Sequence, residues 1–310
     1  MKEIVENIIT KSNIPKKMDN KIINDEKENN EGWSVVIRPQ ESLFSIDFRE
    51  LWRYRDLCAM FVKRDIVTMY KQTVLGPLWF FIQPVMTTAM YMVVFGRIAK
   101  IPTDGVPPPL FYLAGICLWQ YFASCLTKTS STFVANASIF GKVYFPRLVV
   151  PVATVTSHLI KMAIQFLLLV VAYLYFVFFN EAQVRPTVYV LFLPVLVAMV
   201  SGLSLGFGIL FSSMTTKYRD LRMMLSFMVQ LWMYATPVIY PMGMIKGDHL
   251  RFVMQLNPLT GIFEAFKYGL LGAGTFSWGM LAYSACFTIV LVMLGVVVFN
   301  RVQKSFIDTV

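Results

Sequence analysis

The residues that usually carry catalysis or bind metal are few and scattered in this sequence. Its two histidines are His158 and His249, and its four cysteines form no CxxC pair. Cys117 and Cys125 lie in one apolar run, where a helix would separate their Cα atoms by about 12 Å, beyond disulfide reach. The sequence has no GxxxxGK[ST] phosphate-binding loop. We therefore expect no catalytic residues, no metal site and no cofactor in this chain.

Acidic residues are also missing where membrane chemistry would need them. No apolar run carries the series of acidic residues expected of a proton- or sodium-coupled carrier. No cluster of Asp residues marks a metal-dependent sugar-nucleotide transferase. We therefore expect that the chain is not an enzyme, and that any active transport takes its energy from another subunit.

Aromatic residues are abundant, with 26 Phe, 14 Tyr and 6 Trp. Many lie at the ends of apolar runs, where an interfacial aromatic belt is the ordinary explanation. Alternatively, some face a transport path, because amphipathic rings can stack on the apolar faces of sugars. Phe80 and Tyr91 are eleven residues apart, close to three helical turns, so a helix would place them on one face.

The composition identifies the environment in which these residues act. Of the 310 residues, 56% are hydrophobic and 15% are charged, whereas about 25% are charged in an average soluble protein. The mean hydropathy is +0.59, which leaves too little polar surface for a water-soluble globule. These values exclude a soluble enzyme, a secreted disulfide scaffold and a disordered chain, and they indicate an integral membrane protein.

Six long apolar runs predict an all-α protein with six transmembrane helices. The runs are residues 78–96, 110–127, 148–179, 187–213, 223–241 and 278–299. Residues 242–277 are broken by Pro and Gly into pieces too short to span, which predicts short re-entrant helices before the last span. In the fourth run, the Gly202-x-x-x-Gly206 spacing favours close helix packing.

Residues 48–71 predict an amphipathic helix that lies in the membrane interface. Its basic stripe comprises Arg49, Arg53, Asp56, Lys63, Arg64 and Lys71, and its apolar stripe comprises Leu51, Cys58, Val62, Ile66 and Met69. Arg55 and Asp65 fall on or beside the apolar stripe, so we expect both to have polar partners there.

The distribution of charge predicts the orientation and the parts of the chain. The net charge of +10 arises mainly after residue 71, between apolar runs, as the positive-inside rule describes, and no nucleic-acid partner is needed. We expect a flexible cytoplasmic tail at 1–32, a strand and the interface helix at 33–75, and a six-span transmembrane domain at 76–300. A cytoplasmic tail at 301–310 follows, so both termini lie in the cytoplasm.

Several ordered motifs resemble one known family. They are VIRP (36–39), ELWRYRDL (50–57), KRDIVTMYKQTVLGPLWFFIQP (63–84), FGRI (95–98), KVYFPRLVVP (142–151), TPVIYP (236–241) and LNPLTGIFEAFKYGLLG (256–272). The resemblance that they carry covers about residues 33–305. The chain resembles the transmembrane subunits of polysaccharide-exporting ABC transporters, the type 2 permeases that move O-antigen, capsule or teichoic-acid chains.

This resemblance implies partners, and a function for each motif. Such permeases form homodimers with two copies of an ATPase subunit, which binds the ATP and Mg, in the bacterial cytoplasmic (inner) membrane. The cytoplasmic connection at 136–147 would hold the coupling helix, with Ile139, Phe140, Lys142, Tyr144, Phe145 and Arg147 as contact residues. The interface helix, with Arg53, Arg55, Lys63, Arg64 and Asp65, would lie near the ATPase.

The resemblance also implies the path and its exit. It places Trp79, Phe80, Tyr91, Trp232 and Tyr234 beside the path of a lipid-linked polysaccharide. Pro237, Pro241, Asn257 and Pro258 would form the outer gate. The alternatives are a type 2 exporter of drugs or lipids and a membrane-embedded glycosyltransferase. The Tyr and Trp content and the YKQTVLG and KVYFPR runs argue against a drug or lipid exporter. The absence of an acidic site argues against a glycosyltransferase.

Overall fold

The protein is described by a computed structural model that covers residues 48–71, 73–140, 142, 145–179, 184–215, 218 and 220–307. The expected tail at 1–32 and strand at 33–38 lie outside this part of the chain. Every regular element within it is helical, as predicted. The α-helices are α3 (Phe48–Arg53), α4 (Arg55–Tyr70), α5 (Trp79–Tyr91), α6 (Pro108–Thr129), α7 (Thr132–Ala135), α8 (Ala137–Phe140), α9 (Val149–Phe179), α10 (Leu193–Thr215), α11 (Leu221–Tyr234), α12 (Asp248–Gln255), α13 (Pro258–Leu271) and α14 (Trp278–Ile307). Tighter or wider helical turns extend some of them, at η1 (Gly76–Leu78), η2 (Met92–Ile98), η3 (Val188–Phe192) and η4 (Met242–Met244).

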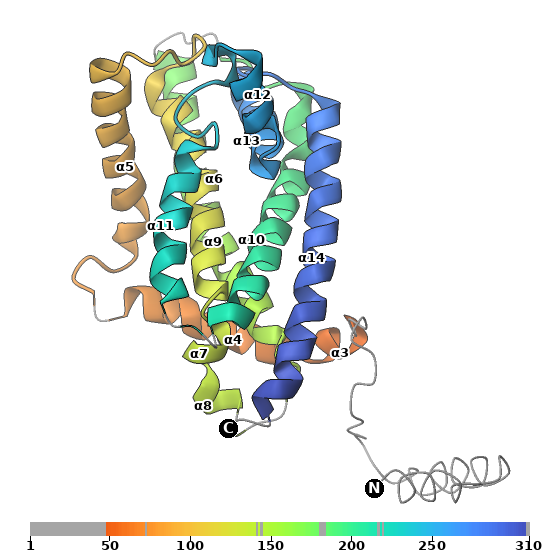
Figure 1. Ribbon diagram of the computed structural model, residues 1–310. Coiled ribbons are helices and arrows are strands. Elements are labelled where there is room, and N and C mark those ends of the chain that lie inside the picture. The colour runs from red at the N-terminus through yellow and green to blue at the C-terminus, as the bar shows by residue number, and fades with distance from the viewer. Residues whose placement is uncertain are drawn as a thin grey trace, which may run out of the picture. The chain divides into compact units, whose positions relative to one another are not determined.

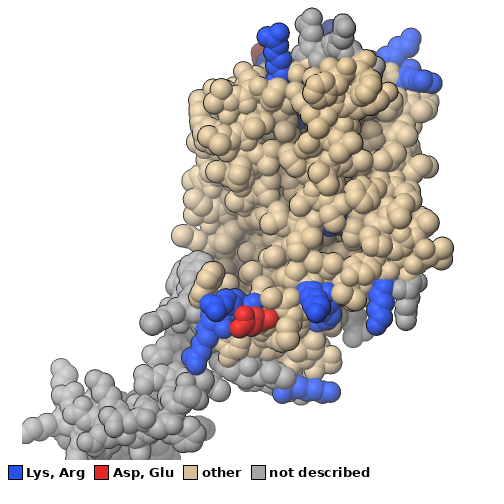
Figure 2. Space-filling model, turned by 180° about the vertical axis from the view of Figure 1, so that it is seen from behind, with Lys and Arg blue, Asp and Glu red and all other residues tan. Residues whose placement is uncertain are grey.

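Five helical stretches in the described ranges are long and apolar enough to cross a membrane. They are Gly76–Ile98, Pro108–Thr129, Val149–Phe179, Val188–Thr215 and Trp278–Val302. They coincide with five of the six predicted runs, and Figure 1 shows their helices running side by side. On the face shown in Figure 2, Lys and Arg gather at the two ends and leave a largely uncharged band between them. This distribution fits a multi-pass membrane protein.

The sixth predicted run, at 223–241, is helical only in part. Its helix α11 contains 14 residues, or about 21 Å, which is shorter than a hydrocarbon core of about 30 Å. The chain leaves the helix after Tyr234 and forms turns that contain Pro237 and Pro241, since proline removes a backbone donor and disfavours a continued helix. The count of six spans therefore stays a prediction.

Helix α6 lies at the centre of the packing. Most of its residues are buried, whereas the other candidate spans expose more of theirs. It packs against α5, α9, α10 and α13. Because α6 is enclosed by protein on several sides, its neighbours provide the surfaces that are open to lipid or to a path.

The glycines of α10 let two helices approach closely, as their spacing predicted. A Cβ on Gly202 would lie 2.6 Å from Thr288 Cγ2 of α14, and one on Gly206 would lie 2.9 Å from Leu291 Cγ. From α14, a Cβ on Gly295 would lie 3.0 Å from the carbonyl oxygen of Gly206. The packing interpretation of this motif is confirmed.

The predicted amphipathic helix at 48–71 is two helices, α3 and α4, which meet at Tyr54. Helix α4 crosses beneath the upright helices and packs on α9 (Figure 1). Its predicted apolar residues are half-buried, and the described side chains of its basic stripe are exposed. The burial of these residues follows the two predicted stripes, while the amphipathic interface helix itself stays a prediction.

The two ends of the bundle differ in what covers them. Figure 1 shows α4, α7, α8 and the end of α14 at one end, here called the α4 end. Helices α12 and α13 lie at the opposite end, here called the α13 end. Helix α13 begins at the N-cap Asn257 and stops at Gly272, which has a φ of 70°, a conformation that favours glycine.

Candidate functional site

The predicted path residues lie on α5 and α11, which meet near the α13 end. The hydroxyl of Tyr91 donates to the sulfur of Met233 on α11 at 3.4 Å. The ring of Tyr91 also makes edge contacts with Phe95 and with Tyr112 of α6. Tyr91 is half-buried, so it joins three helices instead of standing open to a path.

Trp79 and Phe80 lie near the other end of α5. Trp79 is 48% exposed. Phe80 is half-buried, and the Nζ of Lys161 on α9 lies 5.9 Å from the centre of its ring. Phe80 and Tyr91 therefore both turn inward, but Phe80 contacts α9 whereas Tyr91 contacts α6 and α11.

Trp232 and Tyr234 differ in exposure although they are two residues apart. The ring of Trp232 packs edge-on against Phe122 and Phe207, and its Nε1 donates to Asn257 Oδ1 at 3.2 Å. Tyr234 is 49% exposed. Among the five predicted path residues, only Trp79 and Tyr234 present large open ring surfaces.

The charged residues of the interface helix are mostly solvent-facing. Arg53, Arg55, Lys63 and Arg64 are exposed, and Asp65 is half-buried. Asp65 accepts two bonds from Arg64, at 2.8 and 2.9 Å, so it has the polar partner that was expected. Arg55 lies 3.8 Å from Asp56 and above the ring of Trp52. Arg55 lies on the same side of α4 as the apolar residues Cys58 and Val62, as predicted, while the residue itself is exposed.

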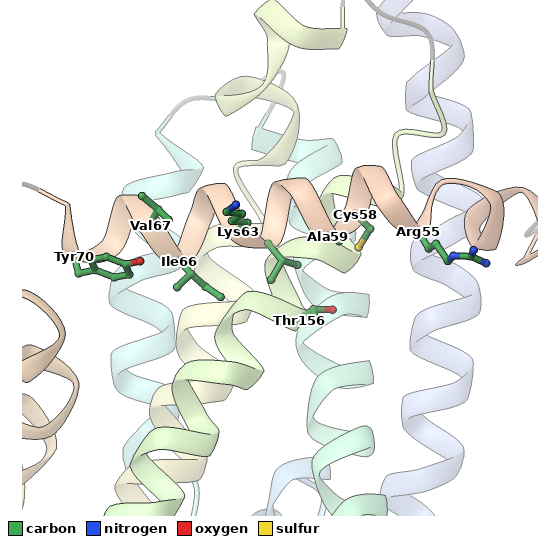
Figure 3. A pocket seen from close by; sticks show the side chains of 9 residues that line it. Arg55, Cys58, Ala59, Lys63, Ile66, Val67, Tyr70 and Thr156 are labelled. Atoms are coloured by element: carbon green, nitrogen blue, oxygen red, sulfur yellow. The ribbon is translucent and has the colours of Figure 1, made fainter.

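An open groove of about 560 Å³ runs along α4 where it meets α9 (Figure 3). Arg55 lies at one end and Tyr70 at the other, with Thr156 of α9 on the facing wall. The rest of the lining is Cys58, Ala59, Val62, Lys63, Ile66 and Val67. Burial raises the pKa of the Cys58 thiol, which therefore adds to the apolar wall. An apolar trough beside two cations is suited to a lipid chain with an anionic head.

The predicted coupling segment is anchored by a cluster of buried side chains at the α4 end, here called the basal cluster. Its members are Phe61, Phe133, Phe140, Phe145, Val149, Val150, Ala153, Ile209 and Phe299. Ring centres are 5.8 Å apart for Phe61 and Phe145, and 5.7 Å apart for Phe140 and Phe145. Phe133 continues the contacts, at 6.1 Å from Phe140 and 4.6 Å from Phe299. The cluster thus joins α4, the coupling segment and α14.

This packing corrects the expectation that Phe140 and Phe145 project as contact residues. Their exposures are only 8% and 5%, because the aromatic cluster takes up their rings. Arg147 is also buried, with its guanidinium 5.3 Å from the Phe140 ring, and this burial lowers its pKa. These residues therefore position the segment.

The outward surface of the coupling segment is made by other residues. Within it, Ile139 is half-buried, and Ser138 and Lys142 are exposed; Val134 of α7, just before the segment, is exposed beside them. Tyr144 lies outside the described residues. Val134 and Ser138 were not predicted. The sequence does not show which side chains of this region are buried in the basal cluster and which stay exposed.

At the α13 end, the predicted gate residues lie within or next to a mostly buried irregular stretch, residues 235–241, here called the outer segment. Pro237, Pro241 and Pro258 are buried, and Asn257 is half-buried. The Nδ2 of Asn257 donates to the carbonyl of Ala235 at 2.8 Å and to Thr236 Oγ1 at 2.9 Å. Asn257, followed by Pro258, therefore holds the start of the segment that contains Pro237 and Pro241.

The outer segment also has a charged neighbour that the sequence analysis missed. Lys267 and Glu264 of α13 are each 1% exposed. The Nζ of Lys267 donates to the carbonyl of Pro237 at 2.5 Å and lies 4.0 Å from the Phe111 ring centre. Burial lowers the pKa of Lys267 to about 8, against the opposing effect of Glu264. Two ionisable residues in an otherwise apolar helix were the available signal.

No group of three or more His, Cys, Asp or Glu side chains that could hold a metal ion occurs in the described part of the chain. The arrangement there consists of buried contacts, an apolar groove and open aromatic faces. It can bind and guide a ligand.

Comparison with known proteins identifies relatives over most of the chain. A family model described as "ABC-2 type transporter" matches residues 56–271. The chain is 27% identical over 258 residues to the O-antigen export system permease protein RfbA of Klebsiella pneumoniae. The aligned region covers 82% of this chain and 94% of that protein. The chain is also 28% identical over 222 residues to the protein of the same name from Myxococcus xanthus. That aligned region covers 71% of this chain and 82% of the relative.

Proposed function

Because the chain belongs to the ABC-2 type transporter family, we propose that it is the membrane subunit of an ABC exporter of a lipid-linked polysaccharide such as O-antigen. The observation that carries this proposal is the similarity to O-antigen export permeases from two organisms over most of the chain. The protein crosses the bacterial cytoplasmic membrane and is not itself an enzyme. A drug or lipid exporter is less well supported, because these relatives are named for O-antigen.

ATP hydrolysis in a separate subunit drives the export. Two copies of this chain pair with two ATPase subunits, which hold the ATP and Mg, so this chain needs no cofactor of its own. The exposed Val134, Ser138 and Lys142, with half-buried Ile139, form the contact surface of the coupling segment. The α4 end therefore faces the cytoplasm.

Six crossings, with both termini in the cytoplasm, complete the proposed topology. Helix α11 and the outer segment make the fifth crossing together, and α12 and α13 cover the exit. Open aromatic faces such as those of Trp79 and Tyr234 suit a moving polymer, because rings hold sugars weakly and without fixed register. The groove along α4 is suited to the lipid end of the substrate.

Deletion of the gene, with radiolabelled sugar to follow the polymer, tests this function. The polysaccharide should disappear from the cell surface and accumulate, still lipid-linked, inside the cell. A plasmid copy of the gene should restore surface polymer, and a copy lacking residues 130–147 should not. Unchanged surface polymer in the deletion strain would rule the function out.

A further inference from the structure

The outer segment is irregular backbone that is held inside the protein from several sides. Thr236 is fully buried, and Val238 and Ile239 are each 1% exposed. Asn257 holds its first two residues. The carbonyl of Val238 lies so close to Gly115 of α6 that a Cβ there would collide with it. Irregular backbone in a membrane protein needs such partners, because lipid cannot satisfy its polar groups.

Lys267 supplies the charged contact of the outer segment. Its ammonium donates to the carbonyl of Pro237 at 2.5 Å and also lies over the Phe111 ring. The ion pairs found among the described residues, Arg55–Asp56 and Arg64–Asp65, do not include Lys267. The buried charge is therefore satisfied by a carbonyl of the segment and not by a carboxylate.

Glu264, on the same helix, has one carboxylate oxygen that is hydrogen-bonded and one that is not. Its Oε2 accepts the backbone N–H of Thr275 at 2.9 Å and the hydroxyl of Thr275 at 3.2 Å. Its Oε1 is buried and has no hydrogen-bond partner in the described part of the chain. A buried carboxylate oxygen without a partner is costly and calls for an explanation.

The spacing of Glu264 and Lys267 indicates that the free Oε1 can accept a hydrogen bond from the lysine. Glu264 and Lys267 are three residues apart on α13, so their side chains lie on neighbouring turns of one face. At this spacing the Cβ atoms of two helical residues are about 5–6 Å apart, which is within the reach of a lysine side chain that changes rotamer. The two side chains can thus satisfy each other whenever the outer segment moves away.

We propose that Lys267 is a positioning residue with two alternative partners, the carbonyl of Pro237 when the exit is closed and Oε1 of Glu264 when the outer segment opens for the polymer. The inference rests on the proposed export function for the meaning of the open state. The exchange keeps the ammonium bonded in both states, so opening leaves no unpaired charge in the membrane. Asn257 retains the start of the segment and acts as its hinge.

Labelling of a cysteine in the outer segment measures its opening. Val238→Cys is introduced into the complex of this chain with its ATPase, and an impermeant maleimide is added from the outside. The same complex without the new cysteine gives the background from the four native cysteines. At rest, without ATP or polymer, Val238→Cys should be nearly unreactive, and adding Lys267→Met should raise its labelling rate about tenfold or more, the size expected for loss of a charge-assisted hydrogen bond.

Glu264→Gln should have the opposite effect. The resting rate should stay low, because the bond between Lys267 and Pro237 is kept. Labelling and export during ATP turnover should fall about threefold or more, since a neutral amide is a poorer partner for the ammonium. The double variant Glu264→Gln/Lys267→Met should behave as Lys267→Met alone, because the free oxygen has no function without the lysine.

Two results would overturn the proposal, and neither depends on the other. One is a low resting rate in a well-folded Lys267→Met complex, and the other is normal turnover labelling in Glu264→Gln. If Lys267→Met does not accumulate, the Glu264→Gln measurement alone decides. If the unmodified complex moves no polysaccharide, the proposed function fails, whereas the resting measurement still tests the contact with Pro237.

Discussion

Asn257 links α11, the outer segment and α13 through one side chain. Its Oδ1 accepts from Trp232 Nε1 and, as the N-cap of α13, from the backbone N–H of Leu259 at 3.1 Å. Its Nδ2 donates to Ala235 and Thr236. Asn257→Ala should therefore lower the free energy of unfolding by about 2–4 kcal/mol, combining a lost cap with unpaired polar groups.

Thermal unfolding of the purified protein in detergent checks this prediction. Asn257→Ser is the matched control, because its hydroxyl keeps a neutral N-cap acceptor and loses the two amide donors. Its unfolding temperature should lie between those of the wild type and Asn257→Ala. An alanine variant as stable as the wild type would contradict the linking role.

Aromatic exposure on α5 and α11 leads to a second prediction at the scale of residues. Trp79→Leu and Tyr234→Leu should each slow polymer export by about threefold at unchanged protein level and basal ATPase activity, since ring stacking contributes about 0.5–1.5 kcal/mol. Phe178→Leu on α9, where the residue is 75% exposed, is the matched control for a lipid-facing aromatic. Equal export by all three variants would remove the support for an aromatic path. Trp232→Leu is less informative, because its ring also supports packing and a hydrogen bond to Asn257.

At the scale of elements, the coupling segment separates into an inner face and an outer face. Phe140→Ala should destabilise the protein by about 3–5 kcal/mol, because it leaves a cavity in the basal cluster. Val134→Asp and Lys142→Glu should leave stability nearly unchanged and weaken co-purification of the ATPase. Thermal unfolding and the ratio of the two subunits after affinity purification measure these effects. Full ATPase recovery with both surface variants would move the contact surface elsewhere.

Sequence patterns predicted the elements better than their contacts. Periodicity located the two-sided helix at 48–71, and glycine spacing located the contact of α10 with α14, because both depend on residues near in sequence. Pro237 and Pro241 already signalled that the run at 223–241 would be interrupted. The break between α3 and α4 at Tyr54, by contrast, was not predictable, because the sequence has no proline or glycine there.

The candidate site was less predictable, because it depends on which partner each side chain finds. Phe140 and Phe145 look like projecting residues until Phe61 and Phe133, from other elements, pack against them. Lys267 looks like one more membrane-flanking lysine until the carbonyl of Pro237, thirty residues earlier, is placed beside it. Such long-range pairs have no signature within a local stretch of sequence.

At the scale of the whole molecule, the orientation can be tested directly. Gly105 and Lys142 are both exposed and belong to loops that the charge pattern assigns to opposite sides. A cysteine at position 105 should react with an impermeant thiol reagent in intact cells, and one at position 142 should react only after the membrane is opened. Unmodified chain provides the background from the native cysteines. The reverse pattern would invert the proposed topology.

The close contact of α10 with α14 also sets an order of events during synthesis. Gly295 leaves the ribosome 89 residues after Gly206 (295 − 206 = 89), which corresponds to about 4–18 s at about 5–20 residues per second. Throughout that interval the glycine face of α10 has no matching surface, since no side chain of its own fills the notch. A nascent chain stopped before Trp278 keeps this face open indefinitely. Helix α14 therefore supplies the surface that the glycine face of α10 lacks, and a stop codon before Trp278 leaves this helix pair unformed.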